Sequence, residues 1–272
     1  MKKRLSTIIL VLIFLIGLSL LLYPTVSDYW NSLHQSRAIA GYVEQVASLD
    51  NDFYEQLWAD AEEYNRTLAG KSNRYTLTDE EKAEYESLLN VSGTGIIGYI
   101  EIPVIDCSLP VYHGTDEAVL QIALGHIEGT SLPVGGEGTH CVISGHRGLP
   151  RARLFTDLDK LVVGDTFMLR VLDETLTYEV DQIRIVEPQE IKEIEIEDGK
   201  DYCTLVTCTP YGINTHRLLV RGHRVENQAE SQNVRVTADA MQIDPVIIAP
   251  LVAVPMLLVL LIILLVKTRR RK

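Results

Sequence analysis

The fold class follows from the stretch YCTLVTC-TPYGINT-HRLLVRGHRV, residues 202–225. Its first and last runs, 202–208 and 216–225, are rich in β-branched and other apolar residues, and the residues between them include Pro and Gly, which favour a turn. This pattern predicts two antiparallel strands that are neighbours in one sheet. The end of the first strand then lies beside the start of the second, which brings Arg217 within reach of Cys208.

The chain upstream of these two strands, from Gly95 onward, has the same character. Further short β-rich runs, separated by Gly and Pro, are IIGYIEI (96–102), HCVIS (140–144), TFMLRVL (166–172) and TLTYEVDQIRIVE (175–187). Several short strands punctuated in this way predict a mainly β domain, either a barrel or a sandwich. The stretch 117–128, which contains AVLQIALGHI, is predicted to be a helix instead.

Helices are predicted in the part of the chain before Gly95. Between residues 27 and 70, apolar residues recur at spacings of three and four, which indicates two amphipathic helices with a break near 48–51. Thr78 and Glu81 have the spacing of a capping box, which predicts a third, short helix that ends near Leu89. These helices are expected to pack on the β domain or to form a stalk.

Charge is distributed unevenly along the 272 residues, which carry 25 Lys and Arg, 37 Asp and Glu and a formal net charge of −12. Eight basic residues lie in 2–4 and 267–272, where there is no acid, so residues 23–245 hold 17 basic and 37 acidic side chains, a net charge of −20. An acidic body of this size repels phosphate backbones, so no nucleic-acid partner is expected. A hydrophobic content of 46% with 23% charged residues excludes a disordered chain.

Both ends of the chain contain apolar runs of membrane-spanning length. Leu5 to Leu22 is uncharged and close to the roughly 20 residues that a spanning helix needs. A cleaved signal peptide is the alternative, but the run is longer than the usual ~7–15 residues and no A-x-A-like site follows it. At the other end, Pro245 to Val266 is uncharged and is predicted to be a transmembrane helix.

Basic clusters flank the outer end of each apolar run, and such clusters remain on the cytoplasmic side of a membrane. We therefore expect both termini to be cytoplasmic and the body between them to be extracellular, held at the cell membrane. The predicted segments are an N-terminal anchor (1–23), a helical segment (24–92), a β domain (93–226), a linker (227–244), a transmembrane helix (245–266) and a basic tail (267–272).

The cysteines provide the candidate nucleophile. None of the four lies in a C-x-x-C pair, so a zinc module is not expected, and the body has no phosphate loop or metal-ligand spacing that would call for a cofactor. Cys107, Cys141 and Cys203 are expected to be buried strand residues. Cys208 ends its strand just before Thr-Pro-Tyr-Gly, which places its thiol at the rim of the sheet. A Cys203–Cys208 disulfide is disfavoured because extended strand holds the two Cα atoms about 16 Å apart.

A nucleophilic thiol needs a partner, since a cysteine with a pKa of about 8.5 is only a few per cent thiolate at neutral pH. Among the seven histidines, His146 lies between glycines just after the 140–144 strand, and His216 is nearer to Cys208 in sequence but begins a strand. The residues alone do not decide between them, and a solvated loop histidine is the simpler reading of either. Arg217 offers a forked cation that can hold an oxyanion or a carbonyl, although an Arg paired with a surface acid is the alternative.

A family resemblance rests on these same residues. Thr204 to Cys208 matches the TLxTC signature of sortases, the membrane-bound cysteine transpeptidases of Gram-positive bacteria. The match continues as TCTPYGINTHRLLVRGHR, and upstream as GYIEIP, LPVYHGT, GHIEGTSLPVGGEGTHCVISGHRGLP and LFTDLDKL. Together these segments cover most of Gly95 to Arg224 and resemble the class C sortases, which polymerise pilins.

The resemblance implies an eight-stranded sortase β-barrel with Cys208 as nucleophile, His146 as acid and base, and Arg217 as the oxyanion or substrate-positioning residue. It also selects His146 among the histidines, which spacing did not do. The implied partners are pilin subunits that carry LPxTG-like sorting signals, and the implied product is an isopeptide bond to a pilin lysine. A housekeeping sortase that uses a peptidoglycan precursor, or a catalytically silent adhesion or scaffold module on the same barrel, are the alternatives.

One segment departs from the class C pattern. Class C sortases commonly carry a lid with an Asp-Pro-aromatic motif, but the corresponding stretch here, 71–90, reads KSNRYTLTDEEKAEYESLLN and contains no proline. Tyr75 or Asp79 are the available substitutes, yet without the fixed φ of proline a tight plug loses its main local cause. We therefore predict that Cys208 is open or only loosely covered.

Overall fold

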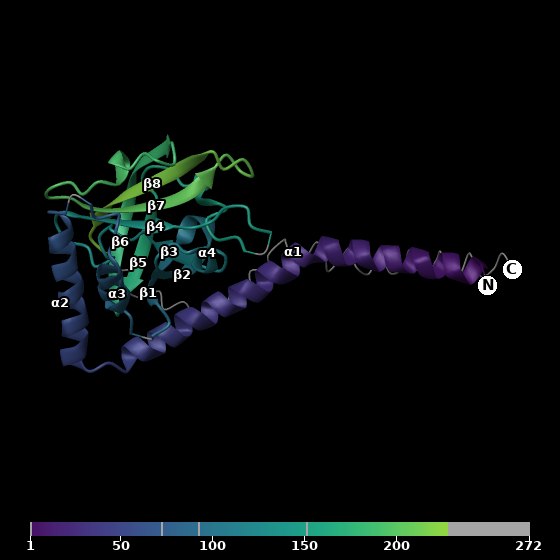
Figure 1. Cartoon of the computed structure of the whole chain (residues 1–272), viewed down its shortest axis with the longest axis horizontal. Helices are drawn as coiled ribbons and strands as arrows, with labels where there is room; N and C mark the ends of the chain where they lie inside the picture. The colour runs from purple at the N-terminus through teal and green to yellow at the C-terminus, as the bar shows by residue number, and fades with distance from the viewer. Residues whose placement is uncertain (1, 72, 92, 151, 228–272) are drawn as a thin grey trace. The chain divides into compact units, whose positions relative to one another are not determined.

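The computed structural model describes residues 2–71, 73–91, 93–150 and 152–227 (Figure 1). The described residues divide between two compact units, one that includes residues 2–29 and one that includes residues 30–227. The predicted C-terminal transmembrane helix and the basic tail, and all of the predicted linker except Asn227, lie outside the described residues.

Three longer helices precede the β domain. They are α1 (Lys2–Ala47), α2 (Asn51–Leu68) and α3 (Asp79–Ser87). The predicted break near 48–51 is confirmed, since the Asp50 side chain caps α2 by accepting a hydrogen bond from the Phe53 amide. The capping box of Thr78 and Glu81 is also confirmed. Among the described residues, one helix, Val11–Ala47 within α1, is long and apolar enough to cross a membrane.

The β domain is a closed barrel of eight strands in the order β1-β2-β3-β4-β7-β8-β6-β5. The β2–β3 and β4–β7 pairs are parallel and the other pairs are antiparallel. All six strands predicted from the sequence are confirmed. The strands are β1 (Ile96–Ile102), β2 (Cys107–His113), β3 (Leu124–His126), β4 (Thr139–Ser144), β5 (Thr166–Val171), β6 (Glu174–Val186), β7 (Asp201–Thr209) and β8 (His216–Val225).

The predicted helix over 117–128 is wrong for most of its length. Only Glu117–Leu120 is helical, as the single turn α4, and Leu124–His126 forms β3 between β2 and β4. The reason is close backbone packing, because a Cβ on Gly125 would lie 2.2 Å from the Gly114 carbonyl oxygen. Pairing with two distant strands therefore overrides the local helical pattern.

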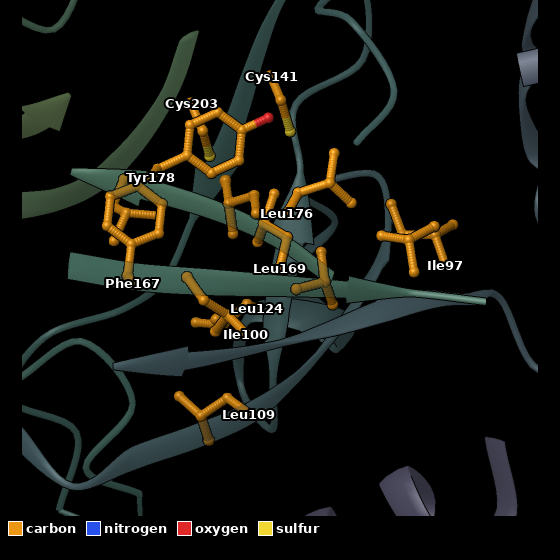
Figure 2. Packing of buried hydrophobic residues seen from close by; sticks show 14 of the residues in the cluster. Ile97, Ile100, Leu109, Leu124, Cys141, Phe167, Leu169, Leu176, Tyr178 and Cys203 are labelled. Atoms are coloured by element: carbon orange, nitrogen blue, oxygen red, sulfur yellow. The ribbon is translucent and has the colours of Figure 1, made fainter. Parts of the chain in front are cut away.

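Side chains alternate across β7, so its two faces have different environments. Cys203 and Leu205 belong to the main core inside the barrel, where Phe167 and Tyr178 stack with ring centroids 5.6 Å apart (Figure 2). Val206 instead packs in a second apolar cluster with Val142, Val186 and Leu219. That cluster lies on the outer face, since residues an even number of positions apart share a face of a strand.

The helices of the second unit pack on the barrel. The Tyr42 hydroxyl of α1 donates to the Ile97 carbonyl at 3.2 Å and accepts from the Leu172 amide at 2.7 Å. From α2, the Asn65 side chain donates to the Leu132 carbonyl and accepts from the Leu132 amide. The helical segment is thus docked on the barrel by buried polar contacts and is not a separate stalk.

Candidate active site

The candidate thiol lies at the end of β7. Cys208 is half-buried and is the residue before the last of this strand. It pairs directly with Arg217, the second residue of β8. The sequence-based prediction that these two residues are neighbours is therefore confirmed.

His146 reaches the same end of the barrel through the parallel β4–β7 pair. In that register Ser144 lies opposite Val206. The pairing continues past β4, because the Gly145 amide donates to the Val206 carbonyl at 3.0 Å and the Thr207 hydroxyl donates to the Gly145 carbonyl at 2.8 Å. His146 follows Ser144 by two residues just as Cys208 follows Val206, so the two lie at neighbouring positions.

Cys208 and Arg217 also share a face of the sheet. Cys208 is two residues from Val206 on β7, and Arg217 is two residues from Leu219 on β8. Because alternate residues of a strand share a face, Cys208 and Arg217 both lie on the outer face, with the second apolar cluster. His216 pairs with Thr209 and, as the neighbour of Arg217 in the strand, lies on the opposite face. The structure thus brings His146, Cys208 and Arg217 together and leaves His216 on the other face of its strand.

Two of these side chains lie near polar groups. Arg217 Nη1 donates to the His216 carbonyl at 3.1 Å and to the Asn214 carbonyl at 3.4 Å. His146 Nε2 lies 3.8 Å from Glu117 Oε2 of α4. Glu117 carries no local sequence signal for this role, since only the path of the chain between β2 and β3 brings it near the histidine.

The other thiols are buried or desolvated. Cys141 and Cys203 are buried opposite each other in the core, as expected, and Figure 2 shows both near Tyr178. Burial raises the pKa of the Cys203 thiol well above its ordinary value. Cys107 is partly exposed to solvent. The protein atoms around its thiol nevertheless desolvate it, which raises its pKa to about 12. All four cysteines are free, so the disfavoured Cys203–Cys208 disulfide is absent.

Arg74, near the start of the segment that corresponds to a lid, makes its contacts far from Cys208, whereas Tyr85 of α3 accepts a hydrogen bond from the Gly114 amide at 3.0 Å. Arg74 is buried and donates to Glu195 Oε2 at 2.6 Å, and the Glu195 carbonyl faces His140 Nδ1 at 2.8 Å. His140 pairs with Tyr202 near the start of β7, six residues or roughly 20 Å of extended strand from Cys208. A hollow of about 460 Å³ lies at that distant end, lined by Ala69, Lys71, Arg74, Tyr75, Gly138, Ile191, Glu195, Ile196 and Asp198.

Comparison with known proteins identifies the family. A family model described as the sortase domain matches residues 100–225. The crystal structure of sortase C1 from Streptococcus agalactiae is 53% identical, with a TM-score of 0.69, and the match covers 71% of this chain and 100% of that one. The chain belongs to the sortase family. This sortase is therefore a cysteine transpeptidase, and its N-terminal apolar helix is a candidate membrane anchor.

Two further relatives support the assignment. The structure of Clostridium perfringens sortase C with the C-terminal cell wall sorting motif is 44% identical to this sortase, with a TM-score of 0.63, and covers 71% of this chain and 100% of that one. Sortase A of Bacillus anthracis is 25% identical over 229 residues, which are 84% of this chain and 99% of that protein. The structural neighbours thus include sortases of class C.

No cluster of three or more His, Cys, Asp or Glu side chains that could hold a metal ion occurs in the part of the chain that the structure describes. What the site offers is a thiol at a strand end, an imidazole on one side and a guanidinium on the other. These are the groups that acyl transfer through a thioester requires.

Proposed function

We propose that this sortase cleaves an LPxTG-like sorting signal in pilin subunits and joins the new carboxyl end to a lysine of another pilin. The observation that carries the proposal is the register of three adjacent strand ends, with Cys208 between His146 and Arg217. The substrate class is supported by the likeness to sortase C structures, one of which was solved with a cell wall sorting motif.

In the first half-reaction, the Cys208 thiolate attacks the carbonyl carbon of the Thr in the signal. The Thr–Gly peptide bond breaks, a thioester to Cys208 forms, and His146 as imidazolium gives its proton to the leaving Gly amine. Arg217 stabilises the oxyanion that develops on the Thr carbonyl oxygen. Its remaining N–H groups are available for this, since the bonds to the His216 and Asn214 carbonyls use Nη1.

In the second half-reaction, the ε-amine of a pilin lysine attacks the thioester. His146 accepts the proton from that amine, the isopeptide bond forms and the Cys208 thiolate leaves. A peptidoglycan-precursor amine would use the same first half-reaction. It remains the second candidate because curated relatives of this chain include enzymes named sortase A.

Access to Cys208 in this proposal does not require a lid to open. Residues 73–76 are held at the other end of β7, where a Cβ on Gly129 would lie 2.0 Å from the Arg74 carbonyl oxygen. We expect Arg74→Ala, which removes the contact with Glu195, to leave the alkylation rate of Cys208 by a small thiol reagent within about twofold of wild type. A large increase would mean that this segment covers the thiol.

We further propose that the body is extracellular and both termini are cytoplasmic, from the basic clusters at 2–4 and 267–272. Protease added to intact protoplasts should then digest the body at sites such as the exposed loop around Tyr211. Protection of that loop, in cells whose cytoplasmic marker proteins are also protected, would reverse the topology.

Mass spectrometry of the acyl-enzyme tests the central proposal. A sorting-signal peptide should add its acyl part to Cys208, and Cys208→Ala should form no adduct, whereas Cys107→Ala should behave as wild type. Release of the adduct by a pilin lysine but not by a peptidoglycan-precursor amine would support pilin polymerisation, and the opposite preference would support the second candidate. An adduct that forms on Cys208→Ala would refute the nucleophile.

A further inference from the structure

The loop between β7 and β8, residues 210–215, contacts the loop that carries His146. The Tyr211 ring of this loop rests on Gly148, two residues after His146. A Cβ on Gly148 would lie 2.9 Å from ring atoms Cε2 and Cζ of Tyr211, and Gly148 has a φ of +74°. Glycine is therefore required here both by its backbone conformation and by the closeness of the ring.

The surface beneath the ring is fixed in place. The Arg147 guanidinium carbon lies 5.7 Å from the centre of the Tyr211 ring, within cation–π distance. Arg147 itself is nine-tenths buried and forms an ion pair with Asp159. The backbone on either side of Arg147 is held as well, because the Phe155 amide donates to the His146 carbonyl and the Gly148 amide to the Thr156 hydroxyl, both at 3.1 Å.

The same loop is joined to the other two candidate residues. It begins after Thr209, the residue that follows Cys208 and ends β7. Its turn is closed by the Asn214 amide, which donates to the Pro210 carbonyl at 3.0 Å. The Asn214 carbonyl in turn accepts one of the hydrogen bonds from Arg217. One short loop is therefore in contact with the segments that carry Cys208, Arg217 and His146.

We propose that Tyr211 is a positioning residue, which sets the place of the His146 imidazole relative to the Cys208 thiol by packing on Gly148 and Arg147. The inference rests on the proposed roles of Cys208 and His146. Tyr211 is 59% exposed, so removal of its ring takes little apolar area from the core and has a small effect on global stability. Its effect falls on the reaction, because proton transfer to the leaving amine depends on the geometry of the imidazole in the transition state.

The kinetic test compares acylation by a sorting-signal peptide in four variants of the full chain. Tyr211→Ala should lower kcat by about tenfold and leave KM within about twofold. Tyr211→Phe keeps the ring and should retain the wild-type rate, whereas Gly148→Ala displaces the ring and should resemble Tyr211→Ala. Ile213→Ala is the matched control, because Ile213 lies in the same loop and is 67% exposed, and it should not change kcat.

A second readout does not depend on the substrate. Hydrogen exchange of the backbone amides of residues 146–148, followed by mass spectrometry, should become about tenfold faster in Tyr211→Ala and stay unchanged in Tyr211→Phe. Unchanged exchange in Tyr211→Ala, or a kcat within twofold of wild type, would overturn the inference. An equal loss in Tyr211→Phe would also overturn it, since the hydroxyl and not the ring would then be responsible.

Failure of the proposed function looks different from failure of this inference. If wild type forms no adduct, or Cys208→Ala still forms one, the proposed function is refuted, and the exchange of residues 146–148 still decides the role of the ring. If wild type forms the adduct, Cys208→Ala does not, and Tyr211→Ala behaves as wild type in both readouts, only the role of Tyr211 is refuted.

Discussion

Lowering the pH from 7 to 5 should destabilise the barrel through His140. This side chain is 1% exposed, with Nδ1 2.8 Å from the Glu195 carbonyl oxygen and Nε2 2.7 Å from the Thr204 hydroxyl. Desolvation lowers the pKa of His140 to about 4, and the nearby Arg221 and Arg74 act in the same direction. The imidazole is therefore neutral in the folded protein throughout this pH range.

The sign follows from proton uptake on unfolding. An unfolded histidine has a pKa of about 6.5, so between pH 6.5 and 4 the unfolded chain binds more protons than the folded one, and the free energy of unfolding falls as the pH falls. With a folded pKa of about 4, the loss between pH 7 and 5 is about 2 kcal/mol from this one residue. His113, whose pKa burial also lowers to about 4, acts in the same direction.

Urea unfolding of wild type and His140→Gln at several pH values measures this contribution. Glutamine is also able to donate one hydrogen bond and accept another, but it does not titrate, so the loss between pH 7 and 5 should be about 2 kcal/mol smaller in the variant than in wild type. Between pH 7 and 8 the two curves should run parallel, because histidine is mostly neutral in both states there. Parallel curves down to pH 5 would refute the reasoning.

Three further predictions concern single side chains. Arg217→Lys keeps the charge but loses the fork, so acylation turnover should fall by at least about tenfold. Arg221→Lys, on the same strand but paired with Asp181, should keep its turnover, and equal turnover in the two variants would contradict the role of Arg217. Iodoacetamide applied at pH 8 should label Cys208 in a peptide map and leave Cys107 unlabelled, because the pKa of Cys107 is raised to about 12; equal labelling would contradict this. Gly129→Ala should lower the free energy of unfolding in urea by about 2 kcal/mol more than Gly138→Ala. Both glycines have positive φ, but a Cβ at 129 would lie 2.0 Å from the Arg74 carbonyl oxygen and one at 138 meets nothing within 4 Å, so equal losses would show that the clash is relieved.

Elements whose partners lie nearby in sequence were predictable. Arg217 beside Cys208 follows from two strands joined by one turn, since local connection alone makes them antiparallel neighbours. The capping box at Thr78 is likewise local. β3 was not predictable, because three residues are too few for a periodic pattern and their extended form depends on β2 and β4.

The place of His146 depends on a contact between distant segments. It lies beside Cys208 only because β4 and β7, some sixty residues apart in sequence, are parallel with Ser144 opposite Val206. Apolar runs such as HCVIS and YCTLVTC carry no information on their mutual register. Residue patterns therefore gave the thiol and the guanidinium, while only family resemblance selected the imidazole.

The position of β8 has a consequence for synthesis of the enzyme. Among the described residues, β8 is the last strand to leave the ribosome, yet it lies between β7 and β6 in the closed barrel. A nascent chain, or one truncated before His216, has nothing to pair with the facing edges of β6 and β7, and it also lacks Arg217. Cys208 is already present in such a chain, but the proposed site around it is not. The transpeptidase is thus expected to become active only once nearly all of its body has been made, which prevents unfinished chains from capturing substrate.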